Sequence, residues 1–188
     1  MADQLKVLVI CGSLRKGSYN AALTRALPAL APPDMKLITA PSFATFPFYN
    51  ADVQDASGFP GPVNDLAEAI RAADGVLFVT PEYNWSIPGV LKNAIDWVSR
   101  LKDQPFKDKP VAIQSASQGP LGGARMQYHL RMALTFSDAL LFGRPEIFVG
   151  LAATKFDKDT LELKDQPTKD IIKQQLAAFA KFIQRMKV

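Results

Sequence analysis

Residues 6–20 read KVLVICGSLRKGSYN, and this stretch decides the fold. Its first six residues form a run rich in β-branched side chains, which is typical of a strand buried on both faces of a sheet. The run ends at Gly12, and apolar residues then return at helical spacing over 20–30. A buried strand that leads through a short polar loop into a helix predicts the first unit of a parallel α/β sheet.

The same alternation recurs along the rest of the chain. The predicted strands are 6–11, 35–39, 76–80, 111–115 and 146–149. The predicted helices are 20–30, 63–73, 88–100, 125–136 and 168–186. This order predicts a doubly wound α/β domain with a five-stranded parallel sheet and helices on both faces. We expect a single domain over 1–188, in which the Pro- and Gly-rich stretches 41–62 and 102–110 are internal loops.

The composition is that of an ordinary globular domain. The length of 188 residues suits one domain with a substantial core. One cysteine and one histidine exclude an internal disulfide, a cysteine-based zinc site and a multi-histidine metal cluster. No stretch resembles a signal peptide or a membrane span, so we expect a cytoplasmic protein with no membrane partner. The net charge of +4 and the pI of 9.2 leave nucleic acids, anionic membranes and small anions as possible ligands.

Three unusual loops follow three of the predicted strands. They span residues 12–20, 81–89 and 115–123. If the strand order is 2-1-3-4-5, these loops leave strands 1, 3 and 4, which are neighbours. Ligands of open parallel sheets bind beyond the carboxyl ends of the strands, where the winding reverses. The three loops together therefore predict one binding site.

The first loop has the chemistry of a phosphate site. It offers the hydroxyls of Ser13 and Ser18, the guanidinium of Arg15 and the free amides of a helix N-terminus, all of which favour an anion. The alternative interpretation is a capped turn that carries a surface arginine.

Three other phosphate motifs do not match this loop. The dinucleotide fingerprint needs a second glycine where Leu14 stands, and a P-loop needs Gly-Lys-Ser/Thr where Gly17 is followed by Ser18. A cysteine phosphatase would need an arginine at position 17 to follow Cys11, which favours a structural role for this cysteine. The phosphate group must therefore belong to a different kind of ligand.

The other two loops favour a planar ring. Tyr83 and Trp85 offer flat apolar surfaces, and the glycines of 115–123 allow the backbone to approach a ligand closely. A phosphate on the first loop and a ring between the other two describe a mononucleotide. Taken singly, each of these two loops is equally consistent with a plain turn.

Several stretches together resemble the NADPH-dependent FMN reductase family, in particular its soluble quinone and chromate reductases. These stretches are 12–20 (GSLRKGSYN), 47–50 (PFYN), 80–84 (TPEYN), 88–96 (PGVLKNAID) and 119–123 (GPLGG). The likeness extends from Lys6 to about Gly150. It implies a flavodoxin-like fold with strand order 2-1-3-4-5 and a bound FMN.

The resemblance also implies which residues bind the cofactor. The FMN phosphate would be held by Ser13, Arg15, Ser18 and Asn20, with Gly17 and Tyr19 in the same cradle. The isoalloxazine would be bordered by Glu82, Tyr83, Asn84 and Trp85, and contacted by Ser117 from the third loop. We expect the Trp85 indole to narrow the pocket or to stack on the substrate. We expect Glu82 to bind backbone or cap a helix, and we name no catalytic residue because the flavin transfers the hydride.

The activity implied is that of an oxidoreductase. NADPH or NADH would reduce the flavin, which would pass electrons to quinones, chromate or similar acceptors. The family implies homodimers, sometimes paired into tetramers. The expected contact surfaces are the aromatic loop 43–49, the outer face of Asn93, Asp96 and Trp97, and, between dimers, Arg125, Tyr128 and Glu146.

Two other functions fit the sequence less well. A flavodoxin-type electron carrier without its own NAD(P)H reaction typically presents an acidic surface, which the net charge of +4 contradicts. Nucleic-acid binding would need basic residues clustered on one face, whereas the charges of the more basic half (95–188) alternate in sign. We therefore expect no nucleic-acid partner. We expect His129 to be an exposed or hydrogen-bonded helical residue.

Overall fold

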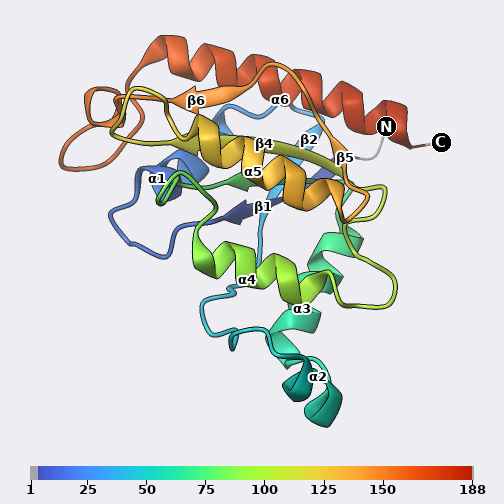
Figure 1. Ribbon diagram of the computed structural model, residues 1–188. Coiled ribbons are helices and arrows are strands. Elements are labelled where there is room, and N and C mark those ends of the chain that lie inside the picture. The colour runs from blue at the N-terminus through green and yellow to red at the C-terminus, as the bar shows by residue number, and fades with distance from the viewer. Residues whose placement is uncertain (1–3, 188) are drawn as a thin grey trace.

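A parallel sheet organises the chain, of which the computed structural model describes residues 4–187 (Figure 1). The strands are β1 (Leu5–Cys11), β2 (Met35–Thr39), β3 (Gly75–Val79), β4 (Pro110–Ala116), β5 (Leu140–Leu141) and β6 (Ile147–Val149). They run in the order β2-β1-β3-β4-β5, and β6 also pairs with β4. The predicted order is confirmed, and it places the ends of β1, β3 and β4 side by side.

The outer strand differs from the prediction because it is divided into two pieces. β5 pairs with the start of β4 at Pro110 and Val111, whereas β6 pairs with its end from Gln114 onward. Over residues 4–187 the sheet therefore has six strands rather than five. Between the two pieces, Pro145 has no N–H to donate to β4, so the ladder is interrupted at this edge.

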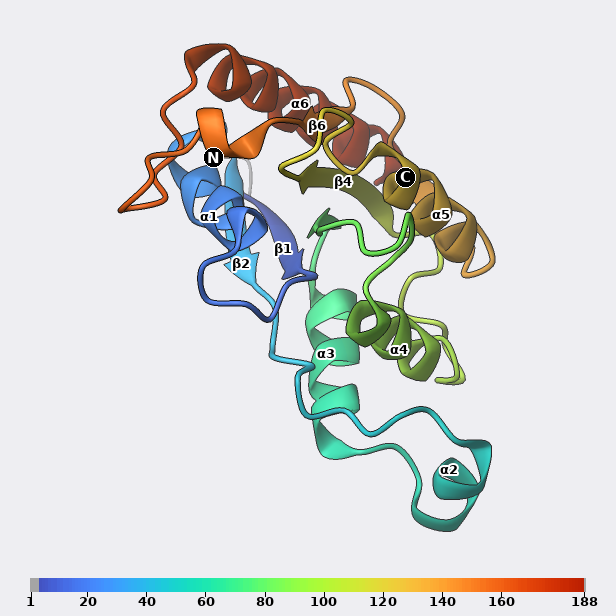
Figure 2. The ribbon, with the colours of Figure 1, turned by 60° about the vertical axis from the view of Figure 1, so that its left-hand side comes forward.

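Helices cover both faces of the sheet, as predicted. On one face lie α1 (Tyr19–Ala26) and α6 (Gln166–Met186), and on the other lie α3 (Gly61–Ala72), α4 (Gly89–Val98) and α5 (Ala124–Thr135). Figure 2 shows α6 on one side of the strands and α3 and α4 on the other. Among residues 4–187, every helix is too short or too polar to cross a membrane.

Two short 3₁₀ helices also occur among the described residues. The predicted helix over 20–30 ends as an α-helix at Ala26 and continues as η1 (Leu27–Ala29), because Pro28 has no N–H with which to extend the α-helical ladder. The second, η2 (Ala152–Thr154), follows β6.

The apolar run of β1 serves two cores. Val7 and Val9 pack toward α1 and α6, whereas Leu8 and Ile10 pack toward α3, α4 and α5. All four side chains are buried. Because successive side chains of a strand point to opposite faces, only a continuous apolar run can fill both layers.

The long connection between β2 and α3 contains a helix that was not predicted. α2 (Ala51–Ser57) begins after Asn50, whose side chain accepts a hydrogen bond from Asp52 N, and it lies away from the sheet in both views (Figures 1 and 2). None of its residues is buried, so no apolar periodicity marks it in the sequence.

The aromatic residues of this connection pack mainly within the chain. The Trp97 indole of α4 is fully buried, donates to Pro47 O over 2.8 Å, and meets the Tyr49 ring edge-on with centroids 5.1 Å apart. The expectation that Trp97 lies on an outer contact face is therefore wrong. Phe43 is also buried, whereas Phe48 is 89% exposed.

We predict that Gly12→Ala destabilises the fold. A Cβ at position 12 would lie 2.1 Å from Thr80 Oγ1, where the ends of β1 and β3 meet. Relief of this overlap should cost about 1–3 kcal/mol in the free energy of unfolding, measured by urea denaturation. Gly61→Ala is the control, because a Cβ there meets no atom within 4 Å. Equal stability of the two variants would contradict the close packing of β1 against β3.

Candidate functional site

The three predicted loops line one cleft at the carboxyl ends of β1, β3 and β4. The cleft has a volume of about 170 Å³. It is lined by Ser13, Arg15, Ser18, Tyr19, Asn20, Pro81, Glu82, Tyr83, Ala116, Ser117 and Gln118. The structure thus brings together eight of the eleven residues predicted for the site and leaves Gly17, Asn84 and Trp85 outside the lining. Pro81, Ala116 and Gln118 were not predicted.

Ser18 shapes the start of α1. Its side-chain oxygen accepts hydrogen bonds from the backbone N–H groups of Asn20, over 3.1 Å, and Ala21, over 3.4 Å. The hydroxyl proton of Ser18 remains available to a ligand, because both of these contacts use the oxygen as acceptor. Ser18 therefore caps the helix and can donate to an anion at the same time.

Arg15 supplies the positive charge of this loop. It is exposed, and its guanidinium has no ion-pair partner among residues 4–187. Ser13 lies beside it in the cleft lining. Gly17 lies in the same turn, where a Cβ would meet Arg15 Nη1 at 3.9 Å. An unpaired guanidinium next to a capped helix start is the donor set that a phosphate monoester requires, so the first loop fits the FMN phosphate.

Asn20 joins the first loop to the third. Its side-chain amide donates to Ala116 O and its carbonyl oxygen accepts from Ala116 N, each over 2.9 Å. The side chain is buried, so it fixes the start of α1 against the end of β4. Contact between Asn20 and a phosphate stays a prediction. The neighbouring Tyr19 ring packs on Phe156, with centroids 5.3 Å apart.

The second loop forms a tight turn. Tyr83 and Ser86 exchange backbone hydrogen bonds, and the two residues between them, Asn84 and Trp85, both have positive φ. Two consecutive left-handed residues are typical of a type I′ turn. The Trp85 indole is 65% exposed and stacks with the Arg125 guanidinium, whose central carbon lies 4.2 Å from the ring centroid.

Glu82 connects the second loop to α5. Its carboxylate accepts a hydrogen bond from Met126 N over 3.0 Å and lies 3.7 Å from Arg125 Nη1. Met126 is in the first turn of α5, where Gly123 at the N-cap position has no side chain to serve these amides. This contact agrees with the prediction that Glu82 binds backbone or caps a helix.

A buried polar network shapes the third loop, and sequence reasoning missed it. Gln127 Nε2 donates to Ser115 Oγ over 2.7 Å and to Ile147 O over 2.8 Å, and Ser115 Oγ donates to Gly122 O over 2.6 Å. Gly122 has positive φ, and a Cβ there would lie 2.6 Å from Phe148 C. The sequence did contain a signal for this network, because Gln127 directly follows Met126 on the apolar side of α5.

The remaining candidates are Ser117, His129 and Cys11. Ser117 donates its hydroxyl to Gly119 O over 3.2 Å at the mouth of the cleft. His129 is exposed on α5 with Nδ1 at 3.0 Å from Ser86 Oγ, which agrees with the prediction of an exposed or hydrogen-bonded residue. Cys11 is a free thiol at the end of β1. Within 4–187, no three acidic, histidine or cysteine side chains are grouped so as to hold a metal ion.

Comparison with known proteins shows the family to which the chain belongs. A family model described as NADPH-dependent FMN reductase matches residues 5–154. The chain is 54% identical over 188 residues to a quinone reductase of Escherichia coli K12, and 48% identical over 187 residues to an NAD(P)H-dependent FMN reductase of Pseudomonas aeruginosa, with full coverage of both chains in each case.

Solved structures agree with these sequence relatives. The flavoenzyme FerB of Paracoccus denitrificans, an NAD(P)H:(acceptor) oxidoreductase, superposes with a TM-score of 0.85 at 33% identity. The match covers 97% of this chain and 98% of FerB. The chain therefore has the same fold as a flavoenzyme, which it matches over nearly the whole length of both chains.

We predict that Glu82→Ala destabilises the protein by about 0.5–2 kcal/mol, because the start of α5 loses its cap. Glu82→Gln should keep most of the stability, since the amide oxygen still accepts the Met126 N–H. Urea denaturation measures both variants, with Glu68→Ala as a control that removes an exposed ion pair with Arg71. If Glu82→Gln unfolded as readily as Glu82→Ala, the carboxylate would not be acting as a cap.

Proposed function

Because this chain belongs to the NADPH-dependent FMN reductase family, we propose that it binds FMN in the cleft between the three loops and uses NAD(P)H to reduce quinones. The observation that carries the proposal is the Arg15 guanidinium, which has no ion-pair partner among residues 4–187 and lies beside the Ser18-capped start of α1. When bound, the flavin supplies the redox chemistry, in which it accepts a hydride from the nicotinamide and returns the electrons to the acceptor. The whole chain, 1–188, is proposed as one FMN-binding domain.

The chain's own residues have the task of binding and orienting the cofactor. Ser13, Arg15 and Ser18 are proposed to hold the phosphate, with Gly17, Tyr19 and Asn20 shaping their loop. The ring is proposed to lie against Glu82, Tyr83, Asn84, Trp85 and Ser117. Because Glu82 is engaged by the amides of α5, it is a structural residue of this wall rather than a general base. No protein acid or base is required by this chemistry.

The acceptor is proposed from the relatives. Quinone reductases of Escherichia coli and Pseudomonas putida are 54% and 42% identical to this chain. We also propose chromate as an acceptor and the cytoplasm as the location, on the resemblance to the chromate-reducing branch of the family. Failure of chromate to accelerate NADPH oxidation would remove it from the acceptors, and recovery of the protein outside the cytosolic fraction would contradict the location.

A homodimer, or a tetramer built from two dimers, is proposed as the assembly. Tyr128, Met132 and Phe136 are exposed at intervals of four residues, so they lie on one face of α5, and Phe136 is 77% exposed. Tyr128 also donates to Glu146 over 3.4 Å, which places two of the expected contacts between dimers together. Light scattering should give two or four times the chain mass of 20.6 kDa, and a monomer mass would contradict the proposal.

The reductase activity is tested with the purified, FMN-loaded protein. We expect anaerobic NADPH alone to bleach the visible absorption of the flavin, and a quinone added afterwards to restore it. Stopped-flow absorbance measures both steps. A flavin that remains oxidised under NADPH would favour the flavodoxin-type electron carrier instead.

We predict that Arg15→Ala weakens FMN binding by about 10- to 150-fold, which corresponds to loss of a charge-assisted hydrogen bond of about 1.5–3 kcal/mol. Quenching of flavin fluorescence measures the dissociation constant. Lys16→Ala is the matched control, because it removes a neighbouring exposed cation that does not line the cleft. Equal effects of the two substitutions would show that general charge, and not the position of Arg15, holds the phosphate.

We predict that Trp85→Ala changes acceptor preference more than FMN affinity. The indole is exposed beside Tyr83 at the rim of the cleft and outside its lining, so it borders the outer edge of the proposed ring site, where an incoming acceptor arrives. The ratio of kcat/KM for a bulky and a small quinone should shift severalfold. A uniform change across acceptors, or a large loss of FMN affinity, would contradict this role.

A further inference from the structure

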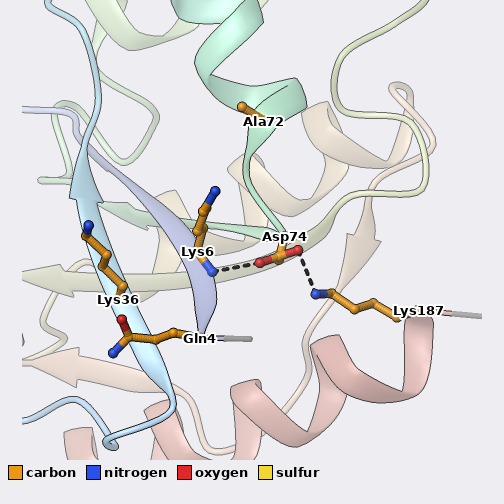
Figure 3. Close-up of a pocket in the computed structure, with 6 residues that line it drawn as sticks. All are labelled: Gln4, Lys6, Lys36, Ala72, Asp74 and Lys187. Carbon is orange, nitrogen blue, oxygen red and sulfur yellow. Dashed lines mark hydrogen bonds and ion pairs between the residues drawn. The ribbon is translucent and has the colours of Figure 1, made fainter. Parts of the chain in front are cut away.

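A second recess lies at the opposite end of the sheet from the FMN cleft. It has a volume of about 440 Å³ and is lined by Gln4, Lys6, Lys36, Ala72, Asp74 and Lys187 (Figure 3). Lys6 stands at the start of β1, five residues before Cys11. At about 3.3 Å per residue, the recess is therefore about 16 Å along the strand from the first loop. It has no part in the proposed FMN reductase reaction.

Two lysines face each other in this recess. Lys6 on β1 is the direct register partner of Lys36 on β2, and both side chains are exposed. Leu8 and Ile10, two and four residues beyond Lys6, pack toward α3, so Lys6 and Lys36 point to that same face of the sheet. Figure 3 shows both side chains extending in the same direction, toward the end of α3 at Ala72.

This pair is an unfavourable arrangement without a counter-ion. Like charges directly opposite each other on neighbouring strands are destabilising. Within residues 4–187, neither lysine side chain forms an ion pair. Helix α3 ends at Ala72, so it leaves the sheet face above the two lysines open to solvent.

Among the residues that the structure describes, Asp74 is the only carboxylate in the recess lining, and it is already engaged. One of its oxygens accepts a hydrogen bond from Lys6 N and the other pairs with Lys187 Nζ, each over 2.7 Å. Burial alone would raise the pKa of Asp74, but these two contacts lower it below its ordinary value, so the carboxylate is charged and each of its oxygens is engaged. Its charge is offset by Lys187, so within 4–187 no carboxylate of the lining compensates the charges of Lys6 and Lys36.

We propose that this recess binds the phosphate group of a small phosphate monoester, with Lys6 and Lys36 neutralising the dianion. Lysine ammonium groups bind phosphate as point charges, and two of them match the charge of one monoester. The recess is much larger than a phosphate group, so the rest of the molecule occupies the space toward Gln4 and Ala72. The nearby Asp74 carboxylate disfavours a second anionic group.

The test is an amide ¹H–¹⁵N NMR titration of the FMN-saturated chain with glycerol 3-phosphate at constant ionic strength. We expect saturable shifts at Lys6, Lys36 and Asp74, with a dissociation constant of about 1 mM or lower. Inorganic phosphate and pyrophosphate are the comparison ligands, and both should bind more weakly. Shifts that grow linearly without saturation would overturn the site, and equal or tighter binding of either comparison ligand would overturn its selection of a monoester.

Variants separate this recess from the FMN cleft. The double variant Lys6→Gln/Lys36→Gln should weaken glycerol 3-phosphate binding by at least about tenfold. If the double variant folds poorly, Lys36→Gln alone serves instead, because it leaves β1 unchanged. This single variant should also weaken binding. Lys173→Gln is the control, because this exposed lysine on α6 lies about 21 Å along the helix from Lys187.

Arg15→Ala tests whether the two sites are independent. This variant should keep the glycerol 3-phosphate shifts at Lys6 and Lys36, whether or not it binds FMN. Shifts confined to 13–20 would assign the anion to the first loop and overturn the proposal. Unchanged binding in the lysine variants would do the same.

Discussion

The buried contact between Asn20 and Ala116 is the constraint on which the candidate site depends. β1 and β4 are not neighbours, because β3 lies between them. The Asn20 amide nevertheless joins the start of α1 to the end of β4 through two reciprocal hydrogen bonds of 2.9 Å. A buried amide must find such partners, since leaving them unmade would cost about 1–3 kcal/mol per group. The first and third loops are thereby held in one cleft, which Arg15, Ser18 and Ser117 all line.

The second and third loops are held by contacts of the same kind. Glu82 fixes the second loop to the first turn of α5, and Gln127 on that helix fixes Ser115 and, through it, Gly122. One helix therefore positions two walls of the cleft. The polar groups that carry these contacts are used by the protein itself, whereas the Arg15 guanidinium, which forms no ion pair with any described residue, remains for a ligand. This division is what a preformed cofactor site requires.

The sequence reveals those features whose cause is local. The β1 run predicts a central strand because both faces of the sheet need apolar side chains. The polar loop after it predicts the phosphate site because its donors lie close together in the sequence. α2 was missed since it buries no residue, and the divided outer strand was missed because pairing with β4 is non-local. The roles of Asn20 and Gln127 depend on partners 96 and 12 residues away, and Trp97 was misplaced because Pro47, 50 residues earlier, covers it.

The central claim is that the first loop recognises the phosphate of a flavin whose ring lies between the other two loops. The most direct measurement compares FMN with riboflavin, which has the same ring and no phosphate, by titration of flavin fluorescence. The account predicts that FMN binds at least about 100-fold more tightly, since a phosphate with several charge-assisted hydrogen bonds contributes about 3 kcal/mol or more. Equal affinities for the two flavins would contradict it.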